Sequence, residues 1–130
     1  MKIGITGTRE GMTPYQCDEV RKVLLKHPAS ELHHGDCTGV DVEVAAIARE
    51  LGYRIVCHPP RLPEQQGFFG GDEMRKPLGY LERDRNIVDE TELLIVVPLQ
   101  TEWQPKGGTW YTHDYAVKQD KPVIIIFPKE

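Results

Sequence analysis

The sequence predicts an α/β fold: a single-domain, Rossmann-like three-layer sandwich with about five mainly parallel strands. Short segments that are almost uniformly apolar, as in strands buried on both faces of a parallel sheet, alternate with segments whose apolar residues recur at helical spacing. The 130 residues are enough for one domain with one core. We therefore expect residues 1–130 to form one domain.

The apolar runs and the capping signals set the expected element limits. The first helix should start after the N-cap residue Thr13, with Pro14 at its first position, and end near His27 and Pro28. The second should end at Gly52. The expected strands span residues 2–6, 31–34, 53–58, 92–98 and 122–127, and the later helices span 40–51, 78–91 and 109–119.

Residues 59–77 break this alternation with proline, glycine and charge, so we expect a long loop there of the kind that is usually functional or mobile.

Composition and charge argue against several classes of protein. The formal net charge is -4 and the pI is about 5.7, which argues against a dedicated nucleic-acid binder with a basic face. Three cysteines without a CxxC pair indicate neither a disulfide framework nor a zinc knuckle. We see no export signal and no apolar run near the roughly 18 residues of a membrane span. We expect a cytoplasmic protein without a membrane partner.

Three glycine-containing turns follow expected strands, and in a parallel sheet these turns meet at the carboxyl edge, where ligands bind. Each opens a helix, whose first amides lack partners and attract anions. One such turn alone is as well explained by ordinary strand–helix geometry, but three together favour a phosphate or nucleotide cradle. The candidate binding residues are Gly7, Thr8 and Arg9, then Gly35, Thr38 and Gly39, then Lys106, Gly107, Gly108 and Thr109.

The helix at 78–91 carries two arginines, Arg83 and Arg85. Residues two apart diverge by about 200° around a helix, so only one of them can point toward the site. The other interpretation is a solvated charge paired with Glu82 or Asp89.

The succession GITGTRE, HGDCTGVD, RDRNIVDE and PKGGTW resembles the SLOG superfamily, named for its Smf/DprA and LOG branches, and is most similar to the YspA or cpYpsA-related branch. The resemblance covers nearly the whole chain. It implies a Rossmannoid domain that binds a nucleotide-derived ligand, with phosphate at Gly107–Thr109. LOG-type enzymes cleave the N-glycosidic bond of nucleoside 5′-monophosphates with an arginine, which aligns with Arg83, and a glutamate.

The position of that glutamate falls on Thr112, whose hydroxyl cannot replace a carboxylate base near neutral pH. The nearest carboxylate, Asp114, faces another side of the helix. We therefore expect Asp36 or Asp41 to orient water or ribose, although a carboxylate at Asp41 also suits a helix N-terminus. Glu10 and Asp84 are weaker candidates.

Two function classes remain open: a nucleotide N-glycoside hydrolase and a non-catalytic nucleotide-binding module. A DNA-handling domain like the DprA branch fits the charge less well. We expect no metal site, because the adjacent His33 and His34 point to opposite faces of a strand and no HxH spacing occurs. We also expect no resident cofactor. Trp110 is expected to contact the ligand or form a lid, and family members commonly form homodimers, so a homodimer is expected here.

Overall fold

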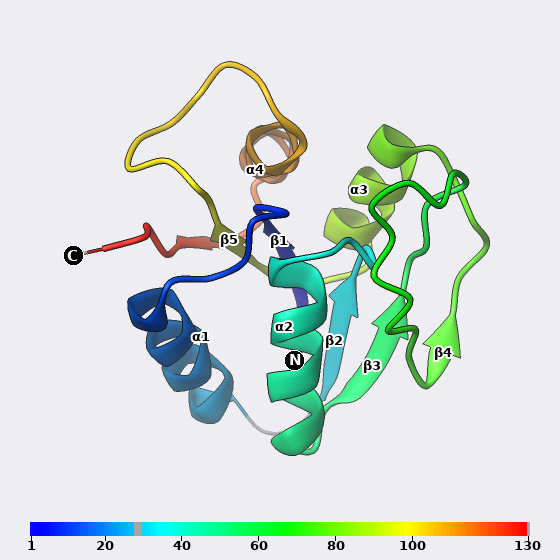
Figure 1. The fold of residues 1–130 in the computed structure, drawn as a ribbon, viewed down its shortest axis with the longest axis horizontal. Coiled ribbons are helices and arrows are strands. Elements are labelled where there is room, and N and C mark those ends of the chain that lie inside the picture. Colours follow the sequence, from blue (N-terminus) through cyan, green and yellow to red (C-terminus); the bar gives the residue numbers. More distant parts are fainter. Residues whose placement is uncertain (28–29, 130) are drawn as a thin grey trace.

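Six parallel strands form one sheet with four helices in the computed structural model, which describes residues 1–27 and 30–129. The strand order is β4-β3-β2-β1-β5-β6, and Figure 1 shows the course of the chain. The elements in chain order are β1 (Lys2–Gly7), α1 (Pro14–Lys26), β2 (Glu31–His34), α2 (Val40–Glu50), β3 (Arg54–Cys57), β4 (Glu73–Met74), α3 (Tyr80–Asp89), β5 (Leu93–Val97), α4 (Gly108–Lys118) and β6 (Val123–Ile125).

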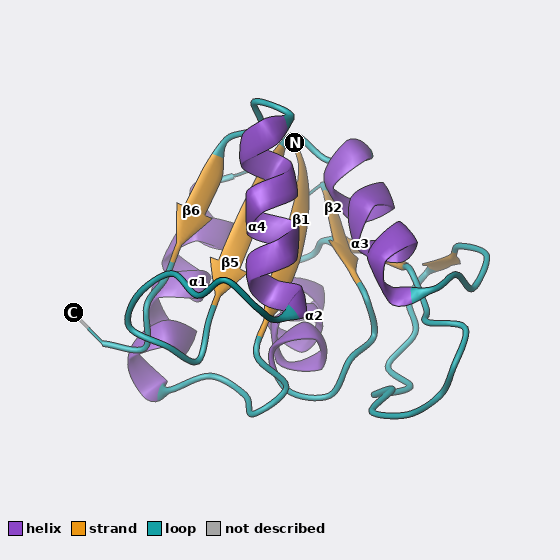
Figure 2. Ribbon diagram, turned by 90° about the horizontal axis from the view of Figure 1, so that it is seen from above, coloured by secondary structure: helices purple, strands orange, loops and turns teal. Residues whose placement is uncertain are grey.

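The sheet lies between two helical layers, which confirms the predicted α/β sandwich. Figure 2 shows α3 and α4 in front of the sheet and α1 and α2 behind it. The larger core lies on the α1 and α2 side, where Ile3, Leu32 and Ile55 are fully buried. A smaller cluster of Val88, Leu94, Val96 and Ala116 packs under α3 and α4. No helix in the described part of the chain is long and apolar enough to cross a membrane.

The predicted start of α1 is confirmed by a capping box. The Thr13 hydroxyl accepts a hydrogen bond from the Gln16 amide at 3.1 Å, and the Gln16 side chain accepts one from the Thr13 amide at 3.0 Å. The helix ends at Lys26, with His27 as its C-cap residue. Pro28, expected near this end, lies outside the described residues.

The sheet has one more strand than the predicted five, because β4 lies within the segment predicted as a loop. Glu73 pairs with Val56, and Met74 with Cys57, in a parallel register. The Asp72 carboxylate accepts a hydrogen bond from the Ile55 amide at 2.8 Å and so holds the edge strand in place. A two-residue strand beside charged neighbours has no apolar pattern by which to predict it.

The direction in which successive strands are added to the sheet reverses between β1 and β5. The chain runs outward from β1 to β2 and β3, and then returns to the other side of β1 with β5 and β6. In open parallel sheets, ligands bind outside the carboxyl ends of the strands at such a reversal. The carboxyl ends of β1 and β5 lie together, because Gly7 is paired with Val97.

Candidate functional site

A cleft of about 430 Å³ opens at this reversal, a size that suits a small-molecule ligand. It lies between the turn after β1, the N-terminal part of α3 and the segment that leads into α4. Its lining includes many of the predicted site residues: Gly7, Thr8, Arg9, Asp41, Arg83, Lys106, Gly107, Gly108 and Thr109. Gly35, Asp36, Thr38 and Gly39 do not line it.

The start of α4 presents free backbone amides to the cleft. Gly107 adopts a φ of 102° as the N-cap residue, with no side-chain cap. A Cβ at Gly107 would meet no atom of the described residues within 4 Å, so the turn is open. The Gly107 carbonyl accepts a hydrogen bond from the Tyr111 amide at 2.9 Å, whereas residues 1–27 and 30–129 supply no acceptor for the amides of residues 108–110. This helix end therefore resembles an anion-binding site.

The turn after β1 is packed tightly onto α2. A Cβ at Gly7 would lie 2.5 Å from the Val40 side chain, and a Cβ at Gly39 would lie 2.5 Å from the Arg9 backbone. The Val40 amide already donates to the Thr8 carbonyl at 3.1 Å. The first amide of α2 thus has a protein partner, whereas those of α4 have none among the described residues.

The second predicted turn contributes less to the cleft than its sequence indicates. The Asp36 carboxylate is buried and accepts hydrogen bonds from the Gln66 side chain and from the amides of Phe69 and Gly70 at 3.0, 2.8 and 3.3 Å. Asp36 therefore organises the loop after β3 and lies away from the cleft. Thr38 is exposed outside the cleft.

Asp41 does reach the cleft wall, where one carboxylate oxygen accepts hydrogen bonds from the Gly35 amide at 2.9 Å and the Cys37 amide at 3.3 Å. Burial raises the pKa of Asp41, against the opposing effect of His34 and Arg83.

Arg83 forms part of the cleft floor, and Arg85 points away from it, as helical spacing requires. Arg83 is only 4% exposed; it donates to the Gly35 carbonyl and, at 3.3 Å, to the His58 carbonyl. Arg85 donates to the Tyr111 hydroxyl at 2.8 Å on the outer surface. Leu81, an apolar residue of the same helix, is 51% exposed at the cleft rim.

Asp84, one of the weaker candidates in the sequence, also lines the cleft. Its Oδ1 accepts a hydrogen bond from Arg83 Nε at 2.7 Å, and its side chain is 12% exposed. Burial raises the pKa of Asp84 to about 6, although the neighbouring Arg83 guanidinium opposes this shift. A carboxyl group that titrates near neutral pH in a cleft is a candidate for proton transfer. Its position directly after Arg83 was the available signal.

The tryptophans fix the segment that leads into α4. Trp110 is buried and donates to Gln100 Oε1 at 3.0 Å. Trp103 donates to Asp114 Oδ1 at 2.9 Å, which ties the segment before α4 to this helix. Trp110 also lines the cleft with only 2% of its surface exposed, and its contact with a ligand stays a prediction.

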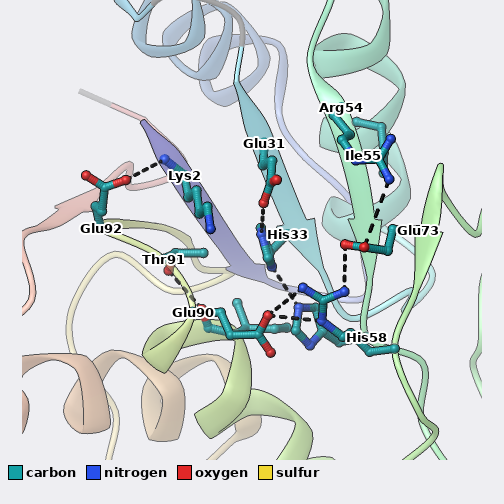
Figure 3. Close-up of polar contacts among 12 residues, drawn as sticks. Lys2, Glu31, His33, Arg54, Ile55, His58, Glu73, Glu90, Thr91 and Glu92 are labelled. Carbon is teal, nitrogen blue, oxygen red and sulfur yellow. Dashed lines mark hydrogen bonds and ion pairs between the residues drawn. The ribbon is translucent and has the colours of Figure 1, made fainter.

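A separate polar network fills the space beneath the C-terminal end of α3 (Figure 3). His33 Nδ1 and His58 Nε2 are 2.8 Å apart, and His33 Nε2 lies 2.9 Å from Glu31 Oε1. Burial lowers the pKa of both rings, that of His58 to about 3. Together with Glu90 they place three metal-ligating groups within 4.8 Å, but Arg75 already binds the Glu90 carboxylate at 2.8 Å. The sequence does not indicate this pairing, because His33 lies on β2 and His58 directly follows β3, 25 residues later.

Comparison with known proteins supports the fold. No protein-family model and no curated protein matches the sequence. A molybdenum cofactor binding protein from the phototrophic bacterium Rippkaea orientalis shares the architecture with a TM-score of 0.72 and 20% identity, over 97% of this chain and 76% of that one. TM1055, a structural-genomics target, has a TM-score of 0.65 and 18% sequence identity, over 94% of this chain and 71% of that one.

DNA processing protein A from Helicobacter pylori, described for its single-stranded DNA binding mode, gives a TM-score of 0.63 at 20% identity. This chain is covered to 96% but spans only 64% of that protein. The chain therefore shares its fold with these proteins, in agreement with the predicted Rossmann-like α/β sandwich.

Proposed function

We propose that the cleft binds the phosphate of a nucleotide-derived small molecule, such as AMP, ADP-ribose or a nucleotide sugar. The observation that carries this proposal is the open start of α4, where a glycine turn leaves amides without acceptors in the described structure. Lys106 precedes these amides and Arg9 lies on the opposite wall, so both can add positive charge. The phosphate would lie against residues 107–109.

The reaction that suits this arrangement is hydrolysis of an N-glycosidic bond, which yields a free base and a sugar phosphate. Arg83, on the cleft floor, corresponds to the arginine of the LOG-type enzymes that the motifs resemble. Carboxyl groups close to the floor, at Asp41 and Asp84, supply candidates for activating water.

A non-catalytic binding module is the second candidate, favoured by Thr112 at the position of the family glutamate. Thr112 is buried, and its hydroxyl donates to the Gly108 carbonyl at 2.8 Å, so it supports the turn. DNA handling has less support, because the cleft combines the cations Arg9, Arg83 and Lys106 with the acids Glu10, Asp41 and Asp84.

A thermal-shift series tests the binding proposal. AMP, ADP-ribose and ribose 5-phosphate are added to the wild type, to Lys106→Ala and to the control Lys118→Ala, which removes the same charge near the far end of α4. A ligand present at about 100 times its Kd stabilises the folded state by about 2.7 kcal/mol, so the wild type should gain several degrees. Lys118→Ala should match it, and Lys106→Ala should gain clearly less. Failure of every phosphate ligand to shift the wild type would reject the proposal.

A further inference from the structure

We propose that Asp84 is the catalytic base of this cleft, in place of the carboxylate that α4 lacks at Thr112. This inference rests on the proposed function and assigns its proton-transfer step to a residue on α3.

The contacts of Asp84 orient one of its oxygens toward the α4 turn. Arg83 Nε holds Oδ1 at 2.7 Å. The other oxygen, Oδ2, faces the start of α4: it would lie 3.9 Å from a Cβ at Gly108. The Thr112 hydroxyl is close enough to influence the pKa of Asp84. A carboxylate oxygen thus lies next to the proposed phosphate site at Gly108, and its carboxyl group senses the Thr112 hydroxyl at the position of the LOG-type glutamate.

The other acidic groups near the cleft are less suited to this role. Asp36 holds three groups of the loop after β3 and does not line the cleft. One Asp41 oxygen accepts two backbone amides, which fix that carboxylate in the wall. Asp114 binds Trp103 and His113 on the outer side of α4. Glu10 is an exposed rim residue, so water screens its charge.

The step balances with water as the only co-reactant. Water adds to C1′ of the sugar while the C1′–N bond breaks, and the electron pair of that bond leaves with the base nitrogen. The ionised Asp84 takes the proton that the water gives up and then releases it to solvent, and the departing nitrogen takes one proton from solvent. Arg83 keeps the carboxylate in position and offsets its charge next to the bound phosphate. The products are a sugar phosphate and a free base.

The environment of Asp84 agrees with this role. Burial raises its pKa to about 6, so the group is mostly ionised at pH 7 but is a better proton acceptor than a solvent-exposed aspartate. Since the base acts in its ionised form, kcat/KM should fall as the pH drops through 6.

The experiment compares the wild type, Asp84→Asn, Asp84→Glu and the control Glu82→Gln, an exposed carboxylate two residues away on the same helix. Each is incubated with AMP between pH 5 and 8, and released adenine is measured by chromatography. Asp84→Asn should lose about 100-fold or more in kcat, the usual contribution of a general base, and should lose the acid limb of its pH profile. Asp84→Glu should retain part of the wild-type kcat, and the pH at which its rate falls should differ from that of the wild type. Glu82→Gln should stay within twofold of the wild type.

Binding of ribose 5-phosphate shows whether Asp84→Asn is folded, and it should be at least as tight as in the wild type because a negative charge has been removed. If the wild type cleaves AMP and folded Asp84→Asn cleaves it within threefold of the same rate, the assignment to Asp84 is wrong while the proposed function stands. If the wild type binds phosphate ligands but releases no base from AMP or a panel of other nucleoside monophosphates, both hydrolysis and this inference are wrong. Without binding or cleavage, the proposed function fails as a whole.

Discussion

At the scale of single residues, two buried acids have different roles because their hydrogen-bond partners differ. Asp36 and Asp84 are both buried, but Asp36 is surrounded by donors from one loop, whereas Asp84 shares a single guanidinium and keeps an oxygen toward the cleft. A carboxylate saturated by backbone amides stabilises the fold. One with incomplete pairing in a cleft is available for chemistry. Hydrogen-bond partners therefore distinguish structural from functional acids here better than residue type does.

The buried pair His33 and His58 makes stability depend on pH. Burial lowers the pKa of His58 to about 3, so in the folded protein this ring stays neutral under mildly acidic conditions, and burial lowers the pKa of His33 in the same direction. The unfolded chain binds protons near pH 6.5, so this stability is fully present above pH 6.5 and is lost as the pH falls below it. His58→Gln should reduce the pH slope of the unfolding free energy by up to about 1.4 kcal/mol per pH unit below 6.5.

Urea unfolding of the wild type and His58→Gln at several pH values between 5 and 8 measures this slope. Asp41 and Asp84 have raised pKa values and act in the opposite direction in both proteins, so the difference between the two curves isolates the histidine. Equal slopes would show that the pKa of His58 is the same in the folded and the unfolded protein, which contradicts this prediction.

At the scale of elements, the site depends on how closely α2 approaches the turn after β1. Gly39 has a φ of 85° and allows the first turn of α2 to lie against the Arg9 backbone. This packing fixes one wall of the cleft, and the open Gly107 turn of α4 forms the facing wall. The two glycines thus have different roles: Gly39 permits close packing, and Gly107 leaves backbone amides accessible.

Gly39→Ala should lower the unfolding free energy by about 2 kcal/mol or more, because the new Cβ combines left-handed backbone strain with a contact of 2.5 Å to backbone atoms. Gly79→Ala is the matched control: Gly79 also precedes a helix, but its φ is -61° and no atom lies within 4 Å of a Cβ there. Chemical denaturation should place Gly79→Ala within about 0.5 kcal/mol of the wild type. Comparable losses in both variants would refute the packing explanation.

At the scale of the whole molecule, the sequence was enough to predict the layered fold, since apolar strands and amphipathic helices leave strong periodic signals. It could not predict β4, whose two residues carry no such signal, nor the exposure of Leu81 at the rim. Within the site, the first and third turns line the cleft as predicted, whereas Asp36 and Thr38 do not. Which strand ends form the cleft depends on strand order, and sequence alone does not reveal strand order.

We propose that phosphate binds at residues 107–109. Three observations support this: the strand order reverses between β1 and β5, the first α4 amides lack acceptors among the described residues, and cations line the cleft. Titration of ¹⁵N-labelled protein with ribose 5-phosphate, followed by amide resonances in NMR spectra, tests this claim most directly. The account predicts that the amides of Gly108, Thr109 and Trp110 shift most and saturate together. Saturating shifts centred elsewhere, for example on the groove between α1 and β6 lined by Tyr15 and Phe127, or no shifts at all, would contradict it.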